Sequence, residues 1–194
     1  MKNKVKSILE GYIKATDRTK QELDIMKERY TSNALMEESA KLKESYKQYC
    51  DQVRNQLKVE FDKQSEKLQS ITDYRVKSSL TNTNNLNNVI AALNTKELDP
   101  MTIKSIINSY SDDPLAISII RKTLTDNSYS NYEIPLTVND KVKAFEEFKN
   151  RALGSISDSR LDGTTGNTSL AISMLDNFDD NLEYVGLKGE MINE

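Results

Sequence analysis

Residues 42–71 read LKESYKQYCDQVRNQLKVEFDKQSEKLQSI, and an apolar or aromatic side chain returns about once per helical turn along this stretch. The series spans 29 residues in 8 steps, with Gln64 at one position, or about 3.6 residues per step. That is the period of a nearly straight α-helix. We expect a helix over about 33–76 whose stripe pairs with another helix, within the chain or between chains. The residues predicted to mediate self-association are Leu42, Tyr46, Tyr49, Val53, Leu57, Phe61, Leu68 and Ile71.

No glycine or proline occurs between Tyr12 and Asp99. Turns depend on these two residue types, so a run this long without them predicts one or two very long helices. We therefore expect residues 1–80 to form an extended, coiled-coil-like oligomerisation segment. Within it, Thr19 and Glu22 match the Thr-x-x-Glu pattern of a capping box, so we expect Thr16 or Asp17 to cap a new helix. The polar run 31–33 predicts a bend or a break.

The composition changes after Ser78, because the Asn- and Thr-rich run 81–88 suits caps and turns better than helix interiors. Further on, Asp99-Pro100 and Asp113-Pro114 each place a capping carboxylate before a proline at the first helical position. We expect a small helical bundle over 84–153, followed by a flexible acidic loop, a helix and a tail over 154–194. Together these segments predict an all-α protein.

Two groups of side chains are candidates for contact with a partner. The first is apolar and lies on the helices of the 84–153 bundle, and the second is an acidic cluster near the last helix. Converging carboxylates can hold metal ions, but on a terminal helix we expect them to face water or a basic partner. The predicted docking residues are Ile103, Ile107, Tyr110, Ile120, Asp176, Asp179 and Asp180.

The chain contains no histidine, which removes the commonest general base and the commonest neutral metal ligand. The sequence has no Walker loop, Rossmann glycine pattern, cysteine pair or metalloprotease signature. The single Cys50 lies on the helical stripe and is expected to be buried. We expect neither enzymatic activity nor a cofactor, with catalysis by carboxylates, Lys or Tyr as the alternative.

Charge is distributed unevenly along the chain. Residues 1–80 carry 17 basic and 13 acidic residues, a net of +4, whereas residues 81–194 carry 10 and 17, a net of −7. The negative second half opposes attraction to phosphates, so we do not expect sequence-specific nucleic-acid binding. The N-terminus lacks a signal-peptide core and no stretch is apolar enough to span a bilayer, so we expect a cytoplasmic protein that does not contact membranes.

Two segments carry a resemblance to known proteins. One is Glu28-Arg29-Tyr30 with the charged helix 42–67, and the other is MTIKSIINSYSDDPLAISII at 101–120, a helix, a Tyr-containing Asp-Pro turn and a second helix. These resemble small helical proteins encoded near the capsid genes of phages and prophages of Gram-positive bacteria. Scaffold-like proteins of this kind are helical, elongated and oligomeric.

The resemblance implies a non-enzymatic role in virion assembly, in the host cytoplasm or within the virion. It implies a homo-oligomer in transient contact with a capsid or other virion protein. The alternative is a cytosolic helical adaptor or regulator that binds a protein or a nucleic acid.

Overall fold

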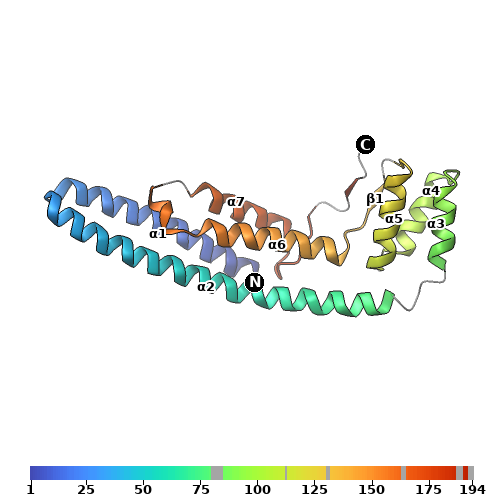
Figure 1. Ribbon diagram of the computed structural model, residues 1–194, viewed down its shortest axis with the longest axis horizontal. Coiled ribbons are helices and arrows are strands. Elements are labelled where there is room, and N and C mark those ends of the chain that lie inside the picture. The colour runs from blue at the N-terminus through green and yellow to red at the C-terminus, as the bar shows by residue number, and fades with distance from the viewer. Residues whose placement is uncertain (80–84, 112, 130–131, 163–164, 187–189, 192–194) are drawn as a thin grey trace. The chain divides into compact units, whose positions relative to one another are not determined.

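The computed structural model describes residues 1–79, 85–111, 113–129, 132–162, 165–186 and 190–191, and helices dominate them (Figure 1). The predicted all-α class is confirmed, with one pair of two-residue antiparallel strands added to the helices. The elements are α1 (Lys2–Arg29), α2 (Ser32–Ser79), α3 (Leu86–Asn94), α4 (Pro100–Ser109), α5 (Pro114–Asp126), β1 (Glu133–Ile134), α6 (Val138–Ser155), η2 (Asp158–Asp162), α7 (Gly166–Met174), η3 (Leu175–Asn177) and β2 (Glu190–Met191).

The first two helices have 28 and 48 residues, as the lack of Gly and Pro predicts. The expected break is confirmed, because the backbone at Tyr30 is extended (ψ 147°) between α1 and α2. The new helix start predicted at Thr16 or Asp17 is wrong, because α1 continues through both residues. The Thr19 hydroxyl donates to the carbonyl of Ala15 (2.9 Å) in the middle of an unbroken α1, since threonine can bond the preceding turn as well as cap a helix.

The chain forms two compact units. Unit 1 comprises residues 1–64 and 145–184, and unit 2 comprises residues 65–144 and 185–194. Their boundaries lie inside α2 and α6, whereas the sequence pattern predicts boundaries at 80–84 and 153–154. A change in composition can indicate a turn between helices. A unit boundary that falls inside a continuous helix causes no change in composition, so the sequence does not indicate it. The predicted linker at 80–84 lies outside the described residues.

The core of unit 1 joins α1, α2 and α6 with the segments that follow α6. The ring of Phe61 meets Phe145 and Phe148 edge-on, with ring centroids 6.0 and 5.6 Å apart. Such pairs contribute beyond simple burial of area. The apolar stripe of α2 therefore packs against other helices of the same chain. The fully buried side chains of this core include Val5, Leu9, Tyr12, Leu57, Phe61, Phe145, Phe148 and Ala171.

Polar contacts fix α1 against α2 within unit 1. The Glu60 carboxylate is buried and accepts hydrogen bonds from the ammonium groups of Lys4 (2.7 Å) and Lys63 (3.2 Å). The bond from Lys4 is the main reason that the pKa of Glu60 lies below its ordinary value. Nearer the middle of α1, the hydroxyl groups of Thr16 and Tyr46 lie 2.7 Å apart. The Lys4–Glu60 and Thr16–Tyr46 contacts join the two helices and set their register, whereas the Lys63 bond lies within α2.

Unit 2 is built around α3, α4 and α5. Both predicted caps are confirmed, since Asp99 accepts from the backbone N–H groups of Met101 and Thr102, and Asp113 from those of Leu115 and Ala116. Such caps typically stabilise a helix by about 1 kcal/mol each. The core of this unit is Leu86, Leu93, Ile103, Ile107, Ala116, Ile117, Ile120, Leu124, Tyr132 and Ile134.

The start of α6 is held by a reciprocal cap that also belongs to unit 2. The Asp140 carboxylate accepts from the Thr137 backbone N–H (2.7 Å), and the Thr137 hydroxyl oxygen accepts from the Asp140 N–H (3.2 Å). Arg121 adds a two-pronged ion pair to the same carboxylate, at 3.0 and 2.9 Å. Burial alone would raise the pKa of Asp140, but these bonds outweigh it and hold the pKa low.

Phe61 provides a test of this packing. Phe61→Ala removes a fully buried ring and should lower the free energy of unfolding by about 3–5 kcal/mol. Val59→Ala, two residues away on the same helix, is the control, because Val59 is 55% exposed and should change stability by no more than about 0.5 kcal/mol. Denaturant unfolding measures both. Equal effects of the two substitutions would contradict the described packing.

Candidate protein-interaction surface

Residues 17–45, which we call the hairpin tip, form the end of the α1–α2 pair. No residue of the tip is buried, although Thr16 and Tyr46 on either side of it are. Figure 1 shows α1 and α2 continuing past η2 and α7 as two helices alone. Two helices alone bury only the side chains that lie between them. Apolar side chains at this end therefore stay partly exposed to solvent.

Apolar side chains are nevertheless present along the tip. Leu23, Met26, Leu35 and Leu42 are half-buried between and beside the two helices. Three more are exposed: Ile25 by 44%, Tyr30 by 46% and Met36 by 78%. Single exposed apolar residues are normal on a protein surface, but a concentration of them at one end of a helical pair is typical of a contact surface.

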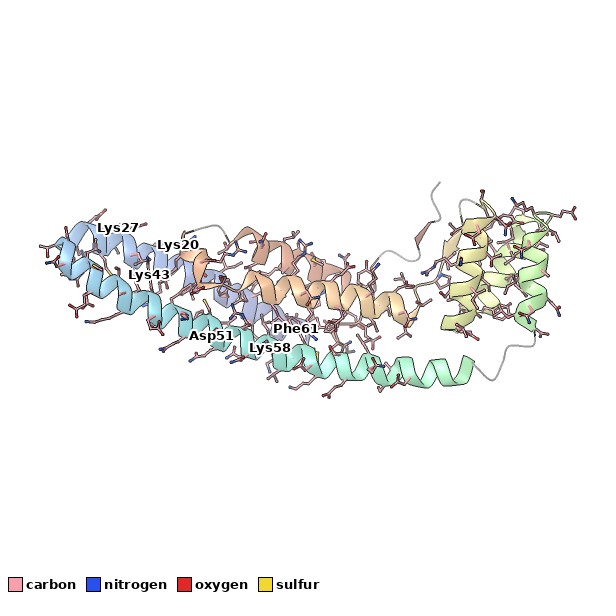
Figure 2. All side chains as sticks on the ribbon, viewed as in Figure 1. Lys20, Lys27, Lys43, Asp51, Lys58 and Phe61 are labelled. Atoms are coloured by element: carbon pink, nitrogen blue, oxygen red, sulfur yellow. The ribbon has the colours of Figure 1, made fainter. Side chains whose placement is uncertain are left out.

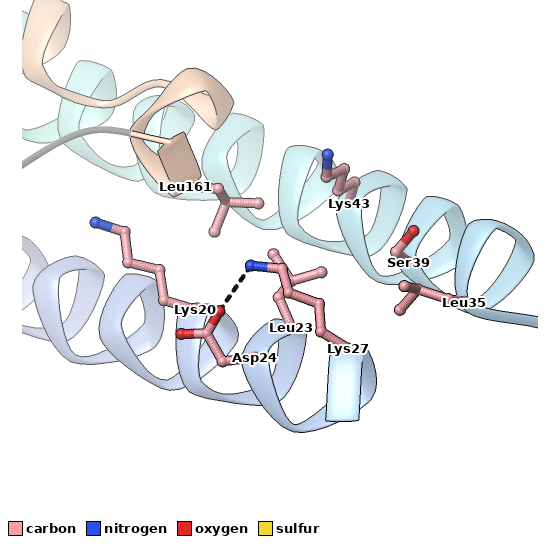
Figure 3. A pocket seen from close by; sticks show the side chains of 8 residues that line it. All are labelled: Lys20, Leu23, Asp24, Lys27, Leu35, Ser39, Lys43 and Leu161. Atoms are coloured by element: carbon pink, nitrogen blue, oxygen red, sulfur yellow. Dashed lines mark hydrogen bonds and ion pairs between the residues drawn. The ribbon is translucent and has the colours of Figure 1, made fainter. Parts of the chain in front are cut away.

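A groove of about 380 Å³ lies in the hairpin tip (Figure 3). Its lining combines leucines with charged side chains, and Figure 3 shows lysines on both helices. The Lys27 ammonium group donates to Asp24 at 2.8 Å, so the one carboxylate of the lining has a basic neighbour. The lining residues are Lys20, Leu23, Asp24, Lys27, Leu35, Ser39, Lys43 and Leu161.

The groove adjoins a second hollow of about 210 Å³, lined by Lys43, Asp158, Ser159 and Leu161. The two hollows share Lys43 and Leu161, so η2 borders both. Figure 2 shows Lys20, Lys27 and Lys43 together at the tip, with Phe61 farther along α2 in the covered part of unit 1. One helical pair therefore has a packed base and a half-open end, and the groove at that end is lined by three lysines and one aspartate.

The structure places most of the predicted self-association stripe in the interior of the single chain. Tyr46, Val53, Leu57, Phe61 and Leu68 are buried, and only Leu42, Tyr49 and Ile71 are half-buried. Of the two alternatives that the periodicity left open, the structure has pairing within the chain. Contact between chains through this stripe would require displacing that packing, so most of these residues have no accessible surface for self-association.

The predicted docking residues also have structural positions. Ile103, Ile107 and Ile120 are buried in the core of unit 2, with Tyr110 partly buried against it. This corrects the expectation that they line a surface: the same periodicity that marks a docking face marks a core face. Among the aspartates, Asp179 accepts from the backbone N–H groups of Asn181 and Glu183, whereas Asp176 and Asp180 are exposed. Of the three predicted aspartates, Asp176 and Asp180 therefore have exposed side chains.

Other chemistry in the described residues is limited. Cys50 is buried as expected, and burial raises the pKa of its thiol, which suppresses the reactive thiolate. The described side chains include no group of three or more potential metal-ligating His, Cys, Asp or Glu residues. Among the helices described, none has the length and apolar character that crossing a bilayer requires.

The hairpin tip is not among the sites that the sequence pattern predicts. Its signal is the weak apolar stripe before Leu42, where Leu23, Met26 and Leu35 are separated by the polar run 31–33. Comparison of the chain with protein-family models, with curated proteins and with solved structures gave no match. The site is therefore interpreted from its own residues.

The hairpin tip should open more readily than the rest of unit 1. Because it has no buried residue, amides of residues 20–27 and 35–43 should exchange with deuterium faster than those of residues 5–12 and 50–61. Hydrogen-exchange mass spectrometry of the free protein measures this difference. Uniform protection along α1 and α2 would show that the tip is as well covered as the base.

Proposed function

We propose that this protein is a non-enzymatic assembly factor that binds a structural partner protein through its hairpin tip. The observation that carries the proposal is the 29-residue stretch 17–45 without one buried residue, next to a fully packed base. Leucines at a half-open helical end have apolar area left to bury, and contact with another protein supplies it. The packed base holds the tip in a defined geometry.

The resemblance of residues 28–30, 42–67 and 101–120 to capsid-proximal phage proteins supports a role in virion morphogenesis. Transient contact with a capsid or other virion protein agrees with a surface that is small and ringed by charges, because charged rims speed encounter and release. In the proposed function, this contact is made by the hairpin tip. Self-association through the apolar stripe of residues 42–71 is not part of it, because most side chains of that stripe are buried.

One observation favours a second candidate function. A stripe covered within one chain means that the protein does not need a second copy to complete its fold. That suits a cytosolic adaptor or regulator that works as a single chain. The two candidates share the same contact surface and differ in the partner, so identifying the partner decides between them.

Co-expression tests the proposed function. Each protein encoded by the genes flanking this one is expressed together with the tagged chain and recovered by affinity purification. We expect a virion structural protein to co-purify with the wild type and with the Val59→Glu control. The double variant Leu23→Glu/Leu35→Glu should lose it, because two carboxylates in the groove cannot be buried.

Circular dichroism checks that the double variant keeps its helices, which it should, since neither leucine is fully buried. Retention of the partner by a folded double variant would place the contact elsewhere. Failure of every flanking protein to co-purify would contradict the role in virion assembly.

A further inference from the structure

We infer that the hairpin tip binds one amphipathic helix of its partner, with acidic side chains flanking an apolar stripe. This inference rests on the proposed function and specifies the partner's chemistry. It is drawn from the shape of the groove, from the charges of its lining and from the ion pairs around it.

The shape of the site favours a helix. The groove is bordered by α1 and α2, which run antiparallel (Figure 1), and it is lined by the half-buried Leu23 and Leu35. A third helix laid along two others is the usual way to cover such leucines, and residues 17–29 of α1 offer about 20 Å of length at about 1.5 Å per residue. A partner helix of about four turns matches that length and would complete a three-helix bundle.

The charges of the lining favour an acidic partner. Three ammonium groups border the groove, those of Lys20 and Lys27 from α1 and that of Lys43 from α2, against the single carboxylate of Asp24. An acidic helix could therefore place carboxylates beside cations on both of its flanks.

Three carboxylates of the tip that lie outside the lining pair with other cations. Glu22 pairs with Arg18 at 2.9 Å, and Glu37 and Glu38 pair with Lys41 at 2.9 and 2.8 Å. None of these five residues belongs to the groove lining. These three acids thus have cations of their own outside the groove, whereas Asp158 borders the adjoining hollow. The lining itself holds three ammonium groups and one carboxylate, and Lys27 and Asp24 among them form an ion pair.

A second copy of this chain fits the groove less well. In a two-fold pair of tips the same patch meets itself, which would bring together two linings that each hold three lysines and one aspartate. Like charges brought together in this way oppose association. Complementarity therefore points to a different partner surface rather than to a tip-to-tip dimer.

Two designed peptides test the inference directly. Both are fluorescein-labelled helices of about 21 residues, or six turns, with leucines in identical positions. One carries Glu at every flanking position and the other carries Lys. We expect the wild-type protein to bind the acidic peptide at least about tenfold more tightly, as measured by fluorescence anisotropy, and added salt should narrow the difference.

Three variants define the binding site. Lys20→Glu/Lys27→Glu/Lys43→Glu should reverse the preference, whereas Lys6→Glu/Lys58→Glu/Lys104→Glu makes the same charge change at exposed positions outside the groove and should retain it. Leu23→Asp/Leu35→Asp should lose both peptides. A reversal by both lysine triples would mean that overall charge, not the groove, selects the peptide, and would overturn the inference.

The outcomes separate this inference from the proposed function. Equal affinity of the wild type for both peptides, or binding of neither, would overturn the acidic-helix assignment while leaving co-purification of a virion protein intact. A clear preference for the acidic peptide without any co-purifying virion protein would instead fault only the assembly role.

Discussion

The edge-on packing of Phe61 against Phe145 and Phe148 is the contact on which unit 1 depends. It joins the middle of α2 to α6, two segments far apart in the sequence, and occupies the centre of the apolar stripe. With these rings in place, α1 is held against α2 by the ion pair between Lys4 and Glu60 and by the contact between the Thr16 and Tyr46 hydroxyl groups. Most apolar side chains of the α2 stripe are thereby buried within one chain.

Because α6, η2 and α7 cover only part of the α1–α2 pair, burial falls along the helices from base to tip. The base has fully buried side chains such as Leu9 and Leu57, whereas residues 17–45 have none. A rigid base and a half-covered end are a useful combination for a binding protein, since the base orients the contact residues before the partner arrives. The groove at this end is lined by three lysines as well as by leucines.

Local features of the fold were predictable from the sequence, because they depend on neighbouring residues. The 3.6-residue stripe, the Asp99 and Asp113 caps and the break after Tyr30 are of this kind. The identity of the stripe's partner was not predictable, since a periodic face says that a helix packs but not against which segment. For the same reason Ile103 and Ile107 were predicted to line a docking surface, because their spacing fits a docking face and a core face equally well. The hairpin tip was not predicted, because it depends on where the later segments of the chain end along α1 and α2.

Zero-length crosslinking of mixed light and heavy-isotope chains tests most directly whether α1 and α2 pair within one molecule. A carbodiimide should join the Lys4 ammonium group to the Glu60 carboxylate, which lie 2.7 Å apart. After co-refolding of equal amounts of the two chains, mass spectrometry of the crosslinked peptide pair should show only all-light and all-heavy forms. Mixed light–heavy pairs would show that the long helices associate between chains, and would contradict pairing of α1 with α2 inside a single molecule.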